Sequence, residues 1–185
     1  MPVRPMRRPF TVREYHRMGK AGILAPDERV ELIEGEIIKM PPIGGPHASR
    51  VNRVSRAFHP VAGGAAILSV QNPLRLSDLS EPVPDLMLLR PRDDFYETHP
   101  APADVLLLVE VSDTTLDYDQ RTKLPLYARE GVPETWIVDL VHTVLLVHRE
   151  PSSTGYQISL KLERGDYVSA LAFPDLRLAA EDVLG

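Results

Sequence analysis

The sequence contains no cysteine, which excludes a disulfide framework and any zinc site with thiolate ligands. Long apolar runs are absent as well, since none approaches the roughly 18 residues that a membrane-spanning helix requires. Met1–Pro5 is followed closely by two arginines but by no apolar segment, which argues against a secretory signal. We therefore expect a cytoplasmic protein that makes no use of a membrane.

The overall composition, in contrast, is ordinary. Hydrophobic residues make up 43% of the 185 residues and charged residues 25%, values typical of a globular protein with a substantial core. Proline is the exception, since its 18 copies are about double the usual share and fall between the regular segments. We expect one domain that spans residues 1–185.

The charge of the chain is unevenly distributed. A formal net charge of −5 disfavours a simple nucleic-acid binder, because neutralising phosphates requires positive charge facing the duplex. Basic residues nevertheless gather in two segments, namely Arg4, Arg7, Arg8, Arg13, Arg17 and Lys20, and then Arg50, Arg53 and Arg56. Acidic residues concentrate in 78–97 and 110–119, where a bound cation would offset part of their charge. The net charge alone therefore neither supports nor excludes a nucleic-acid substrate.

Periodic patterns predict a mixture of helices and strands. Apolar residues recur every three or four positions in the helical segments, and β-rich stretches bounded by turn residues indicate the strands. The expected helices follow a capping box at Thr11 and Glu14, cover His47 to about Gly63, and run from 119–122 to Glu130. The expected strands form a hairpin over 30–40 around Gly35, and then cover 65–70, 74–77, 85–89, 105–111, 135–141, 143–149, 156–162 and 167–173.

The most apolar segment is Val105–Val111. A run without alternation is typical of a strand that helices cover on both faces, as in α/β proteins. Its one charge, Glu110, lies near the carboxyl end, where open α/β sheets usually bind ligands. Pro125 restricts the helix that follows, and we expect a kink if that helix starts before Asp119. The predicted fold class is therefore α/β, with mixed α+β character.

Two carboxylates stand at the ends of consecutive predicted strands. Asp85 opens one strand and Glu110 nearly closes the next, so the two groups converge if the strands are neighbours. Such acids repel each other unless a cation lies between them, and hard oxygen ligands favour Mg²⁺ or Mn²⁺ over zinc. Lys123 precedes Tyr127 by one helical turn, and its ammonium group can orient a water molecule and stabilise a phosphate transition state.

Each candidate also has a purely structural interpretation. An acid at a strand end and a lysine on a helix are usually solvated, which is the simpler account of Asp85 and of Lys123 taken alone. Glu110 differs, because a glutamate in a run of Val and Leu is costly to bury without a partner. His47 could cap the helix that it opens or contact a phosphate, and Gln71 could border a cleft. For both, the structural role is the preferred interpretation.

Several motifs occur in the order found in a known family. They are Glu31-Leu32-Ile33-Glu34-Gly35-Glu36, the loop before His47, Gln71-Asn72-Pro73, Pro84-Asp85, Glu110-Val111-Ser112, Asp119 to Lys123 with Tyr127, and Gly131 to Asp139. Over roughly residues 10 to 150 the sequence resembles the PD-(D/E)xK nucleases. Within them it is most similar to the bacterial branch of restriction-endonuclease-like proteins long catalogued as a domain of unknown function.

The resemblance implies a fold and a metal site. The implied fold is a central mixed β-sheet flanked by helices, here with an added N-terminal β-hairpin and C-terminal β-strands. Asp85 and Glu110 would hold a divalent ion, Mg²⁺ or Mn²⁺, with the Val111 carbonyl as a further ligand.

The resemblance also implies two further catalytic groups. Glu31 or Glu34 would border the site as an additional acid. The lysine of the superfamily signature is replaced by Ser112, and Lys123 from the following helix would take its role.

Three functions are consistent with these residues. The first is a DNA endonuclease in which the ion and Lys123 promote hydrolysis of a phosphodiester. The second is a nucleic-acid or protein binding module of the same fold without catalysis, suggested by the net charge of −5 and by Ser112. The third is a metal-dependent hydrolase of a smaller phosphate substrate. The apolar segment Trp136–Val147 also suggests a homodimer, because it leaves more β surface than a small sheet needs.

Overall fold

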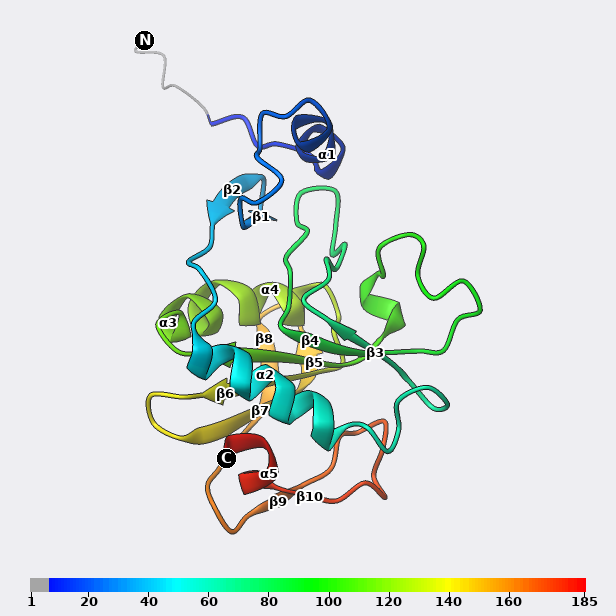
Figure 1. Cartoon of the computed structure of the whole chain (residues 1–185), viewed down its shortest axis with the longest axis vertical. Helices are drawn as coiled ribbons and strands as arrows, with labels where there is room; N and C mark the ends of the chain where they lie inside the picture. Colours follow the sequence, from blue (N-terminus) through cyan, green and yellow to red (C-terminus); the bar gives the residue numbers. More distant parts are fainter. Residues whose placement is uncertain (1–6) are drawn as a thin grey trace.

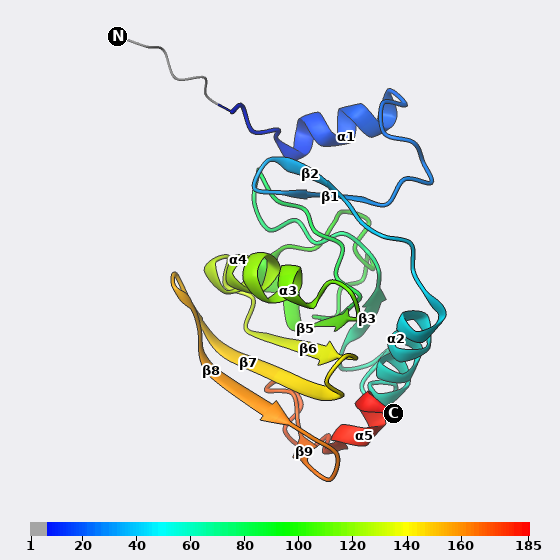
Figure 2. The same cartoon turned by 90° about the vertical axis from the view of Figure 1, so that its left-hand side faces the viewer.

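A mixed β-sheet of six strands forms the centre of the protein (Figures 1 and 2). The computed structural model describes residues 7–185. Residues 1–6, which include Arg4 of the first basic segment, lie outside the described part of the chain. The strands, in spatial order, are β3 (Ile67–Val70), β4 (Leu86–Leu89), β5 (Val105–Ser112), β6 (Glu134–Asp139), β7 (Val144–Ser152) and β8 (Gly155–Leu162). Helices flank this sheet, which confirms the predicted fold class.

The pairing of β4 with β5 determines where the two predicted acids lie. These strands are antiparallel with Leu86 opposite Val109, so Asp85, just before β4, comes next to Glu110. β5 and β6 are parallel, which requires the chain to cross over one face of the sheet between them. The other neighbouring pairs of this sheet are antiparallel.

The strand β5 is covered on both faces, as its unbroken apolar run predicts. Val109 packs on one face in a cluster with side chains of α2 (Gly45–Ala57). Leu108 packs on the other face with side chains of α4 (Leu124–Arg129). Figure 2 shows these two helices on opposite sides of the sheet. Glu110 follows Leu108 at the strand period of two, so its carboxylate faces α4.

The crossover from β5 to β6 is a helical segment with an irregular middle. It consists of α3 (Leu116–Tyr118), the π-helical turn η2 (Asp119–Lys123) and α4. The segment begins earlier than predicted, and the expected irregularity precedes Pro125. Proline has no N–H for the carbonyl four residues earlier, and a wide turn accommodates the missing bond. Lys123 and Tyr127 both lie on the buried side of this segment.

The predicted N-terminal hairpin is present as a separate two-stranded sheet. β1 (Val30–Ile33) and β2 (Glu36–Lys39) pair through a two-residue turn of Glu34 and Gly35, whose φ values are 49° and 80°. Two positive φ values are typical of the type I′ turn, which matches the natural twist of a hairpin. β1 carries Glu31, which is buried. The hairpin therefore contributes an acid to the interior.

The helix α1 (Val12–Lys20) lies on the outer side of this hairpin (Figure 2). Thr11 and Glu14 form the predicted capping box. Gly22, with a φ of 72°, follows the C-cap and allows the chain to turn away. In the described part of the chain, no helix has the length and apolar character needed to cross a bilayer.

The prediction of a strand over residues 74–77 is wrong. Leu74 and Leu76 are buried as the pattern suggests, but their N–H groups donate to the carbonyls of Pro82 and Ser80 across a tight loop. The alternation of apolar residues thus arises because this loop packs against the sheet, although the loop is not one of its strands.

Two elements are shorter than predicted. The strand expected over 167–173 is reduced to two residues, and the helix expected to reach about Gly63 ends at Ala57. The remaining elements are η1 (Pro102–Asp104), β9 (Tyr167–Val168), β10 (Leu178–Ala179) and α5 (Ala180–Leu184). Of the expected C-terminal strands, the one over 156–162 is present in full as β8, whereas the one over 167–173 is reduced to β9, which pairs with β10.

The apolar segment Trp136–Val147 is covered within the chain. Trp136, Leu145 and Val147 pack in one cluster with side chains of β9, β10 and α5. β8 pairs along the outer edge of β7. The surface from which a homodimer was inferred is therefore largely buried inside the chain, and that inference loses its basis.

Gly35→Ala is expected to destabilise the hairpin that carries Glu31. A methyl group on Gly35 would overlap Pro9, whose Cα would lie 2.8 Å away, and would add the strain of a left-handed residue. Gly63→Ala is the matched control, because Gly63 has a φ of 84° with open space around such a group. The expected loss in unfolding free energy, measured in urea, is about 1 kcal/mol for the control and at least about 2 kcal/mol for Gly35→Ala. Equal losses would show that the close approach of Pro9 has no energetic role.

Candidate active site

Hydrogen bonds to both carboxylate oxygens hold Asp85 in one orientation. Oδ2 accepts the N–H of Val111 at 2.8 Å, a bond that crosses from β5. Oδ1 lies 2.8 Å from Nε2 of His47 and accepts from Nε2 of Gln71 at 3.3 Å. Backbone and side chains from three segments therefore converge on this acid.

The same contacts control the ionisation of Asp85 and His47. Burial raises the pKa of Asp85, but the hydrogen bond and charge of His47 and the N–H of Val111 outweigh burial and leave the pKa lowered. The hydrogen bond to Asp85 raises the pKa of His47. The pair therefore favours a carboxylate beside a protonated imidazole.

Glu110 is buried beside Asp85 and faces the crossover helix. Its Oε1 accepts from Nζ of Lys123 at 3.0 Å and from the hydroxyl of Tyr127 at 2.5 Å. Its Oε2 accepts the N–H of Asp85 at 3.4 Å, which places the two acids side by side. Lys123 and Tyr127 are four residues apart on a helix, which explains how both reach one oxygen.

Lys123 joins two carboxylates in the interior. Its side chain is 2% exposed, and Nζ lies 3.0 Å from Oε1 of Glu110 and 3.1 Å from Oε1 of Glu31. The same oxygen of Glu31 accepts the N–H of Val83 at 3.1 Å. The ammonium group thus connects the N-terminal hairpin to the central strand β5.

The pKa values of Glu110 and Lys123 are both raised, but for different reasons. Burial raises the pKa of Glu110 to about 8, since the neighbouring acids, Asp119 first, add to desolvation while Lys123 opposes it. Burial lowers the pKa of Lys123, but the negative charges of Glu110 and Glu31 outweigh burial and raise it above its ordinary value. Lys123 therefore stays an ammonium group at neutral pH. Glu110 is the acid that a further cation would stabilise most.

These groups line one cleft that opens to solvent. Its lining includes Asp85, Glu110, Glu31 and Lys123, together with the loop 40–44 that leads into α2. The cleft lies where the N-terminal hairpin meets the edge formed by β4 and β5. All four residues are buried at this cleft, and none is more than 7% exposed.

The donor atoms of the cleft fit a divalent cation. Oε2 of Glu31 is buried and has no hydrogen-bond partner among residues 7–185. With Asp85 and Glu110 it brings three carboxylates to one cleft, against the ammonium group of Lys123. Hard oxygen donors of this kind favour Mg²⁺ or Mn²⁺ over zinc.

Glu34 does not join the cluster, so one of the two alternatives for the additional acid is excluded. Its side chain is 60% exposed, and its carboxylate pairs with Arg129 at 2.7 Å. Glu31 lies within β1, whose residues 31–33 are all buried, whereas Glu34 is exposed in the turn that follows the strand. The structure therefore places Glu31, and not Glu34, beside Lys123.

Val111 and Ser112 contribute in different ways. Val111 presents its N–H to Asp85, and the role of its carbonyl as a ligand stays a prediction. Ser112 stands where the superfamily has a lysine, and its buried hydroxyl donates to Oδ2 of Asp119 at 2.8 Å. Thr115 donates to the same oxygen at 2.7 Å. These bonds fix the start of η2, the segment that delivers Lys123, against the end of β5.

Three side chains at the acids were not assigned to the site from the sequence. The pattern favours His47 and Gln71 as structural residues, yet both lie within hydrogen-bond distance of Asp85. Tyr127 donates its hydroxyl to Glu110. The usable signals were the position of His47 directly after a glycine loop and the spacing of Tyr127 from the lysine.

The mixed sheet, the crossover helix and the acids at the β4–β5 edge are the features of a restriction-endonuclease-like protein. A family model described as Uma2, “Putative restriction endonuclease”, matches residues 12–181, and the chain belongs to this family. A crystal structure from Anabaena variabilis ATCC 29413, described as that of a “putative nuclease belonging to DUF820”, has a similar fold with a TM-score of 0.72. The two sequences are 19% identical over 95% of this chain and 98% of that one. No curated protein matches the sequence.

Lys123→Met is expected to destabilise the protein, because it leaves Glu110 and Glu31 buried without their ammonium group. Breaking a buried ion pair costs roughly 3–5 kcal/mol, which urea denaturation measures directly. Lys39→Met is the matched control, because Lys39 makes a pair of the same 3.0 Å length with Glu28 in an exposed position and should change little.

The loss on replacing Lys123 should also grow as the pH rises. An acid whose pKa is raised by folding binds more protons in the folded state, so stability falls as the pH rises above its unfolded pKa. Adding Glu110→Gln to Lys123→Met should recover part of the loss at alkaline pH. A Lys123→Met protein as stable as the wild type at every pH would show that the acids do not need the ammonium group.

Proposed function

We propose that this protein is a metal-dependent endonuclease that hydrolyses phosphodiester bonds of DNA. The observation that carries the proposal is the convergence of Asp85, Glu110 and Glu31 with the buried Lys123 in one open cleft. Membership of a family described as “Putative restriction endonuclease” supports nuclease chemistry. The similar fold of the Anabaena variabilis protein, itself described as a “putative nuclease”, points in the same direction.

Asp85, Glu110 and Glu31 would hold Mg²⁺ or Mn²⁺ in this proposal. When bound, such an ion neutralises charge on a phosphate and makes a water molecule more acidic. The chain itself orients the acids, because the N–H of Val111 holds Asp85 and the hydroxyl of Tyr127 holds Glu110. The ligands therefore need little rearrangement before they bind the cation.

Lys123 supplies a fixed positive charge at the floor of the cleft. Its raised pKa keeps it protonated, so it does not accept a proton from the attacking water at neutral pH. It donates hydrogen bonds instead, which orient the water and stabilise the negative charge of the transition state. Glu31 and Glu110 hold its Nζ between them and so set the direction of these bonds.

DNA as the substrate requires positive charge near the cleft despite the net charge of −5. Arg29 lines the cleft, and Arg53 and Arg56 are exposed on α2, the helix that starts at its wall. Arg50 is used otherwise, since it donates to the carbonyl of Val183 at 3.4 Å. Backbone phosphates would contact the exposed arginines while one phosphate enters the cleft.

A catalytically inactive binding module of the same fold is the second candidate. Two observations favour it, namely the net charge of −5 and the use of Ser112, at the signature position, to hold Asp119. It requires DNA or protein binding without cleavage under any divalent ion. A hydrolase of a smaller phosphate, which an acidic surface tolerates better, is distinguished by competition of small phosphates against DNA.

Glu110→Gln is expected to lower Mg²⁺- or Mn²⁺-dependent nicking of plasmid DNA by at least about 100-fold. The amide keeps the shape of the side chain and still accepts the hydroxyl of Tyr127, so the variant should stay folded. Calorimetric titration of the ion and the nicking assay use the same preparation of protein. Glu34→Gln is the control, because this exposed acid pairs with Arg129 outside the cleft and should bind metal and nick as the wild type does.

Each result of this experiment selects one function. Wild-type nicking by a folded Glu110→Gln protein would refute the proposed site. Metal binding by the wild type without hydrolysis of any phosphate would support the binding module. Hydrolysis of small phosphate esters but not of DNA would support the third candidate.

A further inference from the structure

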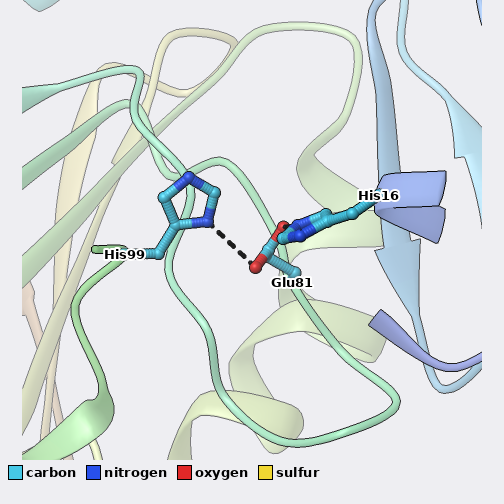
Figure 3. A group of neighbouring side chains, drawn as sticks. All are labelled: His16, Glu81 and His99. Carbon is cyan, nitrogen blue, oxygen red and sulfur yellow. Dashed lines mark hydrogen bonds and ion pairs between the residues drawn. The ribbon is translucent and has the colours of Figure 1, made fainter. Parts of the chain in front are cut away.

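A second group of metal-binding side chains lies outside the cleft. His16 on α1, Glu81 in the loop before β4 and His99 in the loop between β4 and η1 bring their donor atoms within 4.8 Å of one another. Figure 3 shows the carboxylate of Glu81 between the two imidazole rings. None of the three residues lines the cleft that holds Asp85 and Glu110.

The centre of this group, Glu81, is a buried and rigidly held carboxylate. Its side chain is 2% exposed, and its backbone forms a bridge with Leu32, whose carbonyl accepts its N–H at 2.7 Å. Oε1 lies 2.5 Å from Nε2 of His16, and Oε2 lies 3.0 Å from Nδ1 of His99. Among residues 7–185 no lysine or arginine forms an ion pair with it. The two imidazoles are thus the partners of a charge that burial would otherwise penalise.

Two imidazole nitrogens and one carboxylate form a ligand set of a different class from the cleft. The oxygens of the cleft suit Mg²⁺, whereas this set suits borderline transition ions, of which Zn²⁺ is the commonest example. A tetrahedral Zn²⁺ ion with bonds of about 2.1 Å holds its donors roughly 3.4 Å apart, so no pair of donors needs to close by more than roughly 1.4 Å. The side chains of both histidines are 40% exposed, which leaves the rings room to turn inward.

We propose that His16, Glu81 and His99 form a binding site for a divalent transition-metal ion of the Zn²⁺ class. Each imidazole binds through the nitrogen that now faces Glu81, and the N–H proton of that nitrogen moves to the other ring nitrogen or to solvent. Three protein ligands leave a position for water on the exposed side. The ion joins α1 to the two loops on either side of β4, which stabilises the N-terminal layer against the sheet. This role is independent of the proposed nuclease activity.

Zinc binding is tested on the full chain carrying Asp85→Asn and Glu110→Gln, the silenced background, in which two carboxylates of the cleft are replaced by amides and cannot contribute. Competition with a chromophoric chelator gives the affinity for Zn²⁺, and Co²⁺ in place of Zn²⁺ gives a visible spectrum that reports tetrahedral nitrogen ligation. We expect one high-affinity ion per chain. Adding His99→Ala or His16→Ala should weaken binding at least about 100-fold. His59→Ala is the matched control, because His59 is exposed and lies outside the group.

Two results would overturn the proposal. One is the absence of Zn²⁺ binding at micromolar concentrations in the silenced background, and the other is unchanged affinity in His16→Ala and His99→Ala. If the alanine variants do not fold, X-ray absorption of the silenced protein with Zn²⁺ decides the matter. Two imidazole ligands would support the site, and oxygen ligands alone would refute it.

Discussion

The buried ammonium group of Lys123 is the interaction on which the arrangement of this protein depends. A charge that is removed from water must be matched within the interior, and Glu110 and Glu31 match it at 3.0 and 3.1 Å. The three residues come from η2, β5 and β1, so one contact fixes the crossover helix, the central strand and the N-terminal hairpin relative to one another. The ammonium group in turn offsets the repulsion between the two acids. The stability of the fold and the charge of the cleft are therefore consequences of the same triad.

The pairing of the sheet strands supplies most of the remaining geometry. Antiparallel pairing of β4 and β5 places Asp85 beside Glu110, and the N–H of Val111 then fixes the first acid. The parallel step from β5 to β6 requires a crossover, and this crossover is the helical segment that delivers Lys123 and Tyr127. Backbone topology thus brings together four chemical groups from separate elements within residues 85–127.

Much of this arrangement could be predicted from the sequence, because its signals are local. The unbroken apolar run of β5, the turn at Gly35 and the amphipathic pattern of α2 each depend on neighbouring residues alone. The choice between Glu31 and Glu34 could not be made in this way. Both acids lie in one hairpin, and only the packing of that hairpin on the sheet decides which carboxylate is buried.

The other unpredicted features have the same cause. His47 gains its role because the first turn of α2 brings its ring to Asp85, a long-range contact that no local pattern records. Residues 74–77 alternate like a strand but bond to their own loop, since β3 and β4 already pair with each other.

The burial of Lys123 has one more consequence, for its reactivity as an amine. Reagents that modify lysine need an accessible, unprotonated amine, and this side chain is both enclosed and held in its cationic form. Covalent labelling of Lys123 would therefore follow the rate at which the crossover helix separates from the hairpin and β5.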